Sequence, residues 1–322
     1  MGRYEISIMK QLIVDKFKYN YLKKCTQILG KFDKLYPLPG AYKRLHEKTL
    51  KCLKQDLDVV DGYFDEIGFS KMSSEDIFSE GKIWIMWWQG YNEAPKLVKK
   101  NIDTLTNLFG KEKVQLITKE NYKQFVTIST SILKRVEFGQ LGITGFSDVI
   151  RFNLLAAHGG IWVDSTVVAS DLAYDFIKER EGQNFITLNE GQNNYHFISN
   201  AKWAVWFIGG KKGYPLFQYV AKFYDLYFEK HQILIDYLTI DDVIAHFYCV
   251  NHQFKEDIDS IQLKSTPYLL ANNMEQPLSN CKKIITKFDT IEAACIQKFT
   301  YKFDSRMLDN TDTLLYWVVN GR

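Results

Sequence analysis

The sequence predicts an α/β fold, in which a mainly parallel sheet carries helices on both faces and follows a helical N-terminal appendage. From residue 82 onward, short apolar segments alternate with amphipathic helical segments, a pattern typical of parallel strands joined by helices. Residues 6–60 instead carry apolar side chains at helical spacing. The chain has 322 residues, of which 46% are hydrophobic, which is enough for one large domain or for one domain with an appendage.

Residues 1–80 are predicted to form the appendage and residues 81–322 the main domain. Two helices separated by a proline-containing turn are expected in the appendage, over residues 6–35 and 42–60. We expect Gly30 to interrupt or end the first helix. An apolar stripe follows that helix through Ile6, Met9, Ile13, Phe17, Tyr21, Cys25, Ile28, Phe32 and Leu35.

The first 60 residues are strongly basic. They hold 13 Lys and Arg against 6 Asp and Glu, a balance of +7, which leaves −4 for the remainder because the whole chain carries +3. Lysines beside an apolar helical stripe are typical of segments that bind an anionic membrane surface. A solvated helical face, a stripe packed on the main domain, or a contact between two copies in a homodimer would give the same pattern.

The main domain is predicted to alternate strands and helices. The expected strands are residues 82–88, 114–118, 161–163, 185–188 and 203–208. The expected helices are residues 94–109, 120–135, 147–158, 215–230 and 233–248. Pro95 and Gly110 favour the start and the end of the first of these helices.

Residues 146–166 are the most informative part of the chain. They predict a short helix that Ser147 caps, a tight turn at Gly159 and Gly160, and a short buried strand. Asp164 follows that strand directly, at the carboxyl end, where open α/β sheets bind their ligands.

Two pairs of side chains near this segment and near the first strand are candidates for ligand contacts. Asp148 and Arg151 lie three residues apart, so they share one helix face; a surface ion pair would have the same spacing. Trp87 and Trp88 end the first strand, and strand alternation sends them to opposite faces. One of them can stack on a flat ligand, although adjacent tryptophans also occur as plain core residues.

These segments together resemble bacterial capsular polysaccharide synthesis glycosyltransferases. The resemblance lies in the order Ser-Asp-x-x-Arg, Gly-Gly, aromatic and Asp within residues 146–166, and it extends over about residues 82–302. More distantly, the chain resembles sugar transferases with a DxD motif and the glucosylating clostridial toxins. The resemblance implies a GT-A-like, Rossmann-like fold. It also implies transfer of galactose or glucose from a UDP-sugar, with retention, to a lipid-linked oligosaccharide during capsule or surface-polysaccharide synthesis.

The resemblance also implies roles for particular residues. Asp148, Arg151 and Asp164 would be the catalytic residues, and the planar fork of Arg151 suits the oxygens of a diphosphate. Trp88 is expected to stack on the base, with Trp87 as the alternative. The donor pocket would comprise Trp87, Trp88, Gln89, Gly90, Asp148, Arg151, Asp164, Ser165 and Lys298.

A divalent ion, Mn²⁺ or Mg²⁺, is implied at the run Asp164-Ser165-Thr166. In DxD enzymes two carboxylates bind the ion, which neutralises charge on the leaving UDP. Here a threonine replaces the second carboxylate, so Asp164 is the expected anchor and the Thr166 hydroxyl the second ligand, directly or through a water. Lys298, within the basic-aromatic stretch Gln297–Lys302, is expected to approach the diphosphate.

Other residues and other functions stay open. Glu190, Asn200 and the pair Asp241 and Asp242 are candidates for the acceptor side or the cleft, but turns and helix N-termini favour the same residue types. A toxin-like enzyme that glycosylates a protein would share every donor residue. So would a non-catalytic protein that binds sugar nucleotides or glycans.

Composition favours a cytoplasmic protein held peripherally at the inner face of the cell membrane. No apolar run approaches the roughly 20 residues of a membrane span, and the first residues do not resemble a signal peptide. The five cysteines are widely spaced without a CxxC pair, which is typical of reduced thiols and argues against zinc.

No P-loop and no nucleic-acid-binding motif is found. The resemblance implies UDP-galactose or UDP-glucose and the lipid-linked acceptor as partners, the basic N-terminal segment adds anionic lipid, and nucleic acid is not expected.

Overall fold

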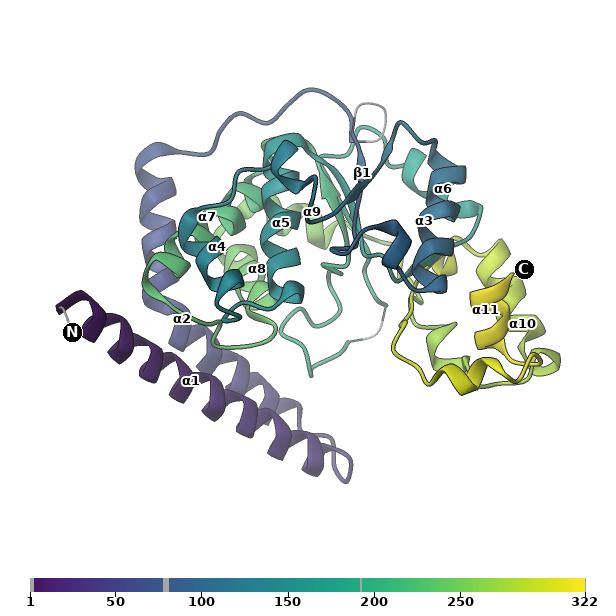
Figure 1. The fold of residues 1–322 in the computed structure, drawn as a ribbon, viewed down its shortest axis with the longest axis horizontal. Coiled ribbons are helices and arrows are strands. Elements are labelled where there is room, and N and C mark those ends of the chain that lie inside the picture. Colours follow the sequence, from purple (N-terminus) through teal and green to yellow (C-terminus); the bar gives the residue numbers. More distant parts are fainter. Residues whose placement is uncertain (1–2, 78–80, 192, 322) are drawn as a thin grey trace.

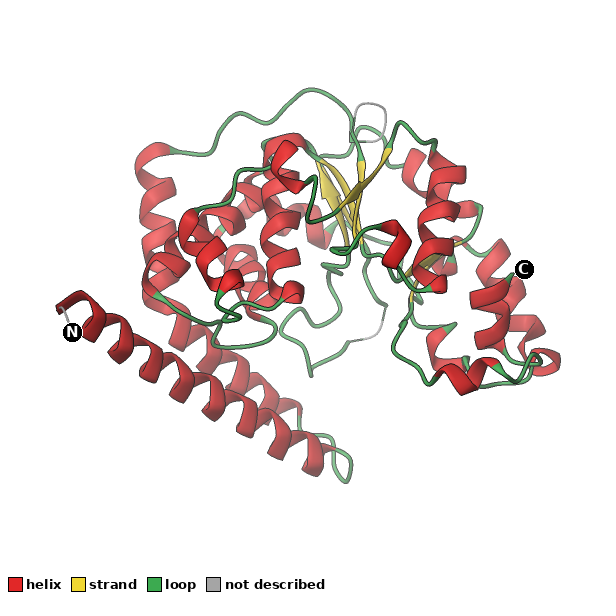
Figure 2. Cartoon of the chain, in the orientation of Figure 1, coloured by secondary structure: helices red, strands yellow, loops and turns green. Residues whose placement is uncertain are grey.

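The sheet at the middle of the molecule (Figure 2) has five strands. The computed structural model describes residues 3–77, 81–191 and 193–321. The strands of the sheet are β1 (Ile83–Met86), β2 (Val114–Ile117), β3 (Gly160–Val163), β5 (Phe185–Thr187) and β6 (Phe207–Gly210), in the order β2-β1-β3-β6-β5. β1 pairs in parallel with β2 and β3, whereas β6 runs antiparallel to β3 and β5. The predicted mainly parallel sheet is therefore confirmed, with one strand reversed.

Helices cover both faces of this sheet (Figure 1). One face is covered by α4 (Thr130–Glu137), α5 (Ile143–His158), α7 (Pro215–Lys230), α8 (Thr239–Val250) and α9 (His252–Asp259). The other face is covered by α3 (Lys96–Phe109) and α6 (Leu172–Lys178). A small C-terminal unit adds α10 (Leu278–Thr290), α11 (Leu314–Asn320) and a two-stranded antiparallel sheet of β4 (Val167–Ala169) and β7 (Ile296–Lys298).

The alternation of side chains along the strands divides the core into two parts. Trp84 and Trp162 are buried on the side of α5 and α7, whereas Ile85 and Val163 are buried on the side of α3 and α6. Both faces of the sheet are thus apolar, as expected for parallel strands between helical layers.

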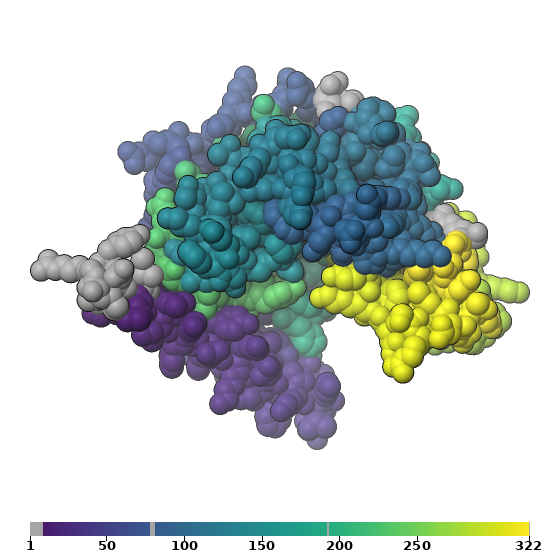
Figure 3. Space-filling view, in the orientation of Figure 1, coloured from purple at the N-terminus to yellow at the C-terminus, as the bar shows by residue number. Residues whose placement is uncertain are grey.

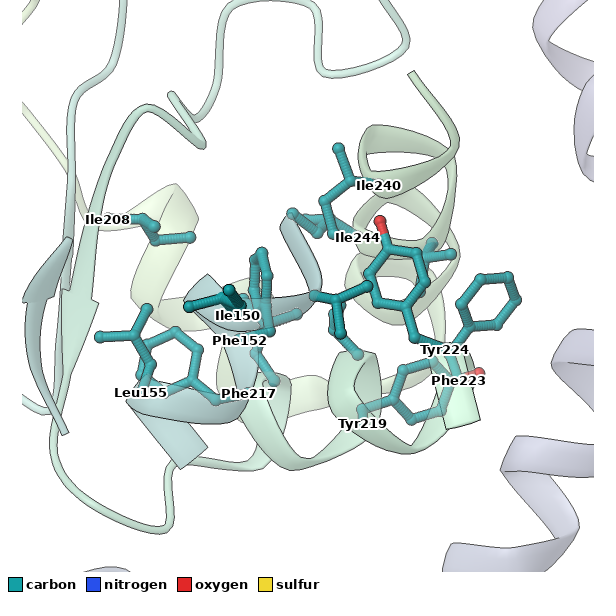
Figure 4. Close-up of a cluster of buried hydrophobic side chains, with 14 of the residues drawn as sticks. Ile150, Phe152, Leu155, Ile208, Phe217, Tyr219, Phe223, Tyr224, Ile240 and Ile244 are labelled. Atoms are coloured by element: carbon teal, nitrogen blue, oxygen red, sulfur yellow. The ribbon is translucent and has the colours of Figure 1, made fainter. Parts of the chain in front are cut away.

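The first of these cores fixes the position of α5. Figure 4 shows Ile150, Phe152 and Leu155 of α5 packed against aromatic side chains of α7, including Phe217. Each large apolar side chain that is fully buried contributes about 1.5–3 kcal/mol, so several on one helix hold it firmly. Any residue on the exposed edge of α5 is therefore presented from a rigid support.

The predicted N-terminal helical segment is confirmed as a long hairpin of α1 (Arg3–Asp33) and α2 (Pro39–Ile67). Leu53, Leu57 and Val60 of α2 are buried in the same core as α7 and α8. Gly30 was expected to break the first helix, and that prediction is wrong, since α1 continues to Asp33. One glycine costs a helix only about 1 kcal/mol, which packing against α2 offsets.

Three predicted elements differ in the structure. The predicted helix over 120–135 is a 3₁₀ turn at Tyr122–Gln124 followed by α4, because the β-branched run between them is extended and buries Val126 and Ile128. The predicted helix over 233–248 begins only at Thr239, whose hydroxyl donates to the Asp236 carbonyl at 2.8 Å.

The third difference concerns the predicted strand over 203–208. β6 covers only its last two residues and extends to Gly210, while Trp203 and Trp206 precede the strand in a turn. Immediately before this segment, Asn200 and Ala201 adopt left-handed backbone conformations with φ of 46° and 66°, so the chain turns just ahead of Trp203. The turn directs Trp206 toward the strand end at which Asp164 lies.

Candidate active site

The helix-turn-strand predicted around Asp164 is present. α5 ends at Gly159, and Gly160, with φ of 90°, opens β3. A Cβ atom on Gly160 would lie 2.3 Å from the Lys82 carbonyl oxygen, so only glycine permits this close approach of the chains. The predicted cap at Ser147 is wrong: α5 begins one turn earlier, and the Ser147 hydroxyl donates to the Thr144 carbonyl at 2.6 Å.

Asp164 is the centre of the polar cluster. Its Oδ1 accepts hydrogen bonds from Trp162 Nε1 at 2.8 Å and from Arg151 Nη2 at 3.2 Å. Its Oδ2 accepts from Lys298 Nζ at 2.5 Å. Burial would raise the pKa of Asp164, but the charges of Lys298 and Arg151 and these hydrogen bonds hold that pKa below its usual value. The carboxylate is therefore ionised and paired with two cations.

Arg151 joins the two predicted carboxylates. Its side chain is 5% exposed, with Nη2 on Asp164 and Nη1 3.0 Å from Asp148 Oδ1. The guanidinium carbon lies 4.9 Å from the centroid of the Trp162 ring, an arrangement that stabilises a cation. Within the described residues, Nε and Nη1 form no hydrogen bond of good geometry. Both of these nitrogens are buried, so Arg151 contributes to the pocket as a positive charge in its wall.

Asp148 faces the same guanidinium from α5 itself. Burial raises its pKa to about 6, and the nearby charge of Asp164 adds to this, while Arg151 lowers it. Asp148 and Arg151 form an i,i+3 pair, but the pair is buried, unlike the surface ion pair that their spacing also allowed.

Lys298 reaches the cluster from the far end of the chain. β7 pairs with β4 in the register Val167↔Lys298, which places the lysine beside the run Asp164-Ser165-Thr166. Its Nζ contacts Asp164 Oδ2 and lies 3.0 Å from Thr166 Oγ1. A turn closed by Val167 N and the Asp164 carbonyl, at 2.9 Å, holds the run in place, and Asn101 of α3 donates to the Ser165 carbonyl at 3.0 Å.

A divalent cation at this position would need free oxygen ligands. Both carboxylate oxygens of Asp164 already bind donors, two of which are cationic, and the Thr166 hydroxyl is bonded to Lys298. No group of three or more His, Cys, Asp or Glu suited to a metal occurs in the described parts of the chain. Mn²⁺ and Mg²⁺ favour several oxygen ligands around one ion, so the side chains present here do not fit a bound divalent ion.

These charged groups line one pocket of about 660 Å³. Asp148, Arg151, Asp164 and Lys298 lie in its wall together with Trp206. Other lining residues come from the segment 233–240, which precedes and begins α8, and from α1 through Tyr19. The size is in the range of small-molecule sites, so the cluster is accessible to a ligand of nucleotide-sugar size.

The tryptophans that end β1 lie outside the lining of this pocket. Trp87 and Trp88 pack against the cores on opposite faces of the sheet, as alternation predicts. Trp88 lies edge-on to Phe146, with ring centroids 5.4 Å apart, and Trp87 lies edge-on to Tyr301, at 5.2 Å. Both are half-buried, and their role in base stacking stays a prediction. Gln89 is exposed, and Gly90, with φ of 88°, turns the chain after β1.

A second group of acids lies behind Trp206 and Trp203. Glu190 accepts hydrogen bonds from Trp206 Nε1 at 3.2 Å and from Tyr268 at 3.0 Å. Asp241, in the first turn of α8, accepts from Trp203 Nε1 at 2.8 Å, and burial raises its pKa to about 7. For Asp241, the sequence signal was the pair of adjacent acids, Asp241 and Asp242, in the apolar start of a helix.

Comparison with known proteins gives one match. A family model described as "Capsular polysaccharide synthesis protein" matches residues 40–317. No curated protein and no solved structure matches the chain. The matched range contains each predicted site residue from Trp87 to Lys298, and it excludes α1.

Proposed function

Because the chain belongs to the capsular polysaccharide synthesis protein family, we propose that it is a glycosyltransferase of capsule assembly. The donor we propose is UDP-galactose or UDP-glucose, and the acceptor a lipid-linked oligosaccharide. A GT-A-like fold, a distant relationship to the DxD transferases and clostridial toxins, and retention of configuration complete the proposal. The observation that supports it best is the pocket in which Arg151 and Lys298 flank Asp164.

This arrangement suits the departure of a diphosphate. The acceptor hydroxyl oxygen forms a bond to the anomeric carbon while the bond from that carbon to the phosphate oxygen breaks. The hydroxyl proton passes to the departing diphosphate. Arg151 places a positive charge in the pocket wall and can stabilise the charge that develops on the leaving group. Asp148 lies next to Arg151, and its carboxylate can accept hydrogen bonds from sugar hydroxyls.

The test is release of nucleoside diphosphate from a panel of UDP-, GDP- and dTDP-sugars, with and without extracted lipid-linked oligosaccharide. We expect slow UDP release alone and faster release with acceptor. Binding of a UDP-sugar without any release would instead identify a non-catalytic binding protein, and transfer to protein alone would support the toxin-like alternative.

The two tryptophans give a prediction about the nucleotide base. Base-aromatic stacking contributes about 1–3 kcal/mol, so alanine at the stacking residue should raise the Kd for UDP about 5- to 150-fold. We expect this for Trp88→Ala, or for Trp87→Ala if the base lies on the Tyr301 side. Trp317→Ala removes a half-buried tryptophan of α11 and is the matched control. Unchanged UDP affinity in both β1 variants contradicts this assignment of the base.

The exposed side of α1 supports a membrane role for the N-terminal hairpin. α1 lies on the outside of the molecule (Figure 3). Ile13 and Phe17 on the predicted apolar stripe are 63% and 73% exposed, and Ile28, Phe32 and Leu35 are exposed as well. The stripe therefore does not pack on the main domain. The face that packs inward instead holds Asp15 and Leu22.

We propose that this stripe and its lysines bind the anionic inner leaflet, where a lipid-linked acceptor is located. Apolar burial and attraction of lysines to anionic lipid, about 1 kcal/mol per charge, act together on such a helix. None of the helices that the structure describes is both long and apolar enough to cross a bilayer. The pocket lies close to this surface, because Tyr19 of α1 lines it.

Co-sedimentation with phosphatidylglycerol vesicles tests the membrane proposal. The full chain should pellet at low salt, and the double variant Ile13→Ser, Phe17→Ser should lose most of that binding. The matched control is Val59→Ser, Ile67→Ser, which removes two similarly exposed apolar side chains from α2. Equal pelleting of both variants contradicts the proposal. A dimer that only the α1 variant dissociates, without lipid binding, would identify the stripe as a homodimer contact.

A further inference from the structure

We propose that Lys298 takes the place of a divalent cation in this site, so that the donor diphosphate is bound and released without a metal ion. This inference rests on the proposed function, since it assumes a nucleoside diphosphate leaving group. Lys298 would be a catalytic residue that donates a hydrogen bond to the departing diphosphate.

The position of the ammonium supports this first. Lys298 Nζ lies between Asp164 Oδ2 and Thr166 Oγ1, at 2.5 Å and 3.0 Å, which are the two side chains expected to hold the ion. An ammonium has three donors, and these contacts use two. Lys298 also lines the pocket that holds Arg151, so the third donor can reach a ligand there.

The backbone holds Lys298 in this position. The Lys298 amide donates to the Pro267 carbonyl at 2.7 Å, and the next amide, of Phe299, donates to the Thr166 carbonyl at 3.1 Å. The preceding side chain, Gln297, is fully buried, and its amide nitrogen donates to the backbone carbonyls of Thr266 and Ala294. The ammonium is thus preorganised, as electrostatic stabilisation of a leaving group requires.

The charge balance supports the same role. In a DxD site, two carboxylates and one divalent ion sum to zero. Here one carboxylate, one threonine hydroxyl and one ammonium also sum to zero. Relative to a DxD site, Thr166 removes one negative charge, and the ammonium of Lys298 carries one positive charge fewer than a divalent ion. The net charge next to the diphosphate is therefore the same, and the electric field there is similar. A divalent ion added to this set would be repelled by Lys298 and Arg151.

The experiment measures UDP binding to the full chain by calorimetry, once in excess EDTA and once in MnCl₂. We expect the two Kd values to agree within about twofold. Lys298→Met should weaken binding in EDTA about 10- to 150-fold, the range for loss of a hydrogen bond to a charged group. Lys298→Arg should recover part of it. Lys302→Met, an exposed lysine of the same segment, is the matched control and should bind as the wild type does.

Wild-type UDP binding that requires Mn²⁺ overturns the inference and leaves the proposed function standing. Equal UDP affinity of Lys298→Met and the wild type in EDTA also overturns the inference. Failure to bind UDP, GDP or dTDP in either buffer overturns the proposed function and the inference with it. The comparison of EDTA with Mn²⁺ uses the unmodified protein, so it decides the question even if a Lys298 variant folds poorly.

Discussion

Replacing Asp164 by asparagine is expected to lower the rate of sugar transfer at least about 100- to 1,000-fold, the range for loss of one preorganised electrostatic contact. Asparagine keeps the shape of the side chain, but one oxygen is replaced by an NH₂ group, which cannot accept a hydrogen bond. Because both oxygens accept from cations, Arg151 on one and Lys298 on the other, the amide must face one of them. The cluster at the pocket wall then has one negative charge fewer, and the cation that faces the NH₂ group loses its hydrogen bond.

The measurement is UDP release at saturating donor, with circular dichroism to verify the fold. A buried hydrogen-bonding group without its partner costs about 1–3 kcal/mol, so the assay should run well below the melting temperature. Asp175→Asn, an exposed acid on α6, is the matched control. Transfer by Asp164→Asn above a tenth of the wild-type rate would remove this carboxylate from the catalytic set.

Arg151→Lys is expected to lower kcat strongly at saturating donor, and to weaken donor binding as well. The guanidinium contacts Asp148, Asp164 and the Trp162 ring at once. An ammonium has one centre and no planar fork, so it can replace only part of these contacts. We expect about 100-fold lower kcat for lysine, and a larger loss for methionine, which leaves Asp148 without its cation and Asp164 with Lys298 alone.

Arg180→Lys is a suitable control for this substitution. Arg180 pairs with Glu292 at 2.9 Å and lies over the Phe176 ring at 3.7 Å, so it has the same kinds of contact far from the pocket. The variant Arg180→Lys should change the free energy of unfolding without changing kcat. If Arg151→Lys changes KM and leaves kcat normal, Arg151 contributes only to ground-state binding.

Local patterns in the sequence predicted the parts of the site that are local in the chain. The helix-turn-strand before Asp164 depends on a glycine pair and an apolar run, and the structure contains it with the charged face of α5 beside it. The alternation that separates Trp87 from Trp88 is equally local. The start of α5 was misplaced because a serine before an apolar helical run resembles a cap, whereas here the helix already begins at Ile143.

The rest of the site depends on contacts between distant residues. The burial of Asp241 follows from its hydrogen bond to Trp203, 38 residues away, and the contribution of Tyr19 to the pocket follows from the packing of α1. α2 was expected to belong to an appendage, yet it shares the core with α7 and α8. Sequence spacing carries no information about such contacts, because tertiary packing alone creates them.

The pairing of β7 with β4 also determines when the site can form during synthesis. Asp164 and Lys298 are 134 residues apart, so at about 5–20 residues per second the ribosome needs roughly 7 to 27 seconds to make the second after the first. During that interval the nascent chain contains α5 and β3, but β4 lacks its partner strand and exposes an unpaired edge. A polypeptide that stops before residue 296 therefore lacks both the lysine and the strand that delivers it, and the charge cluster cannot assemble until β7 has been made.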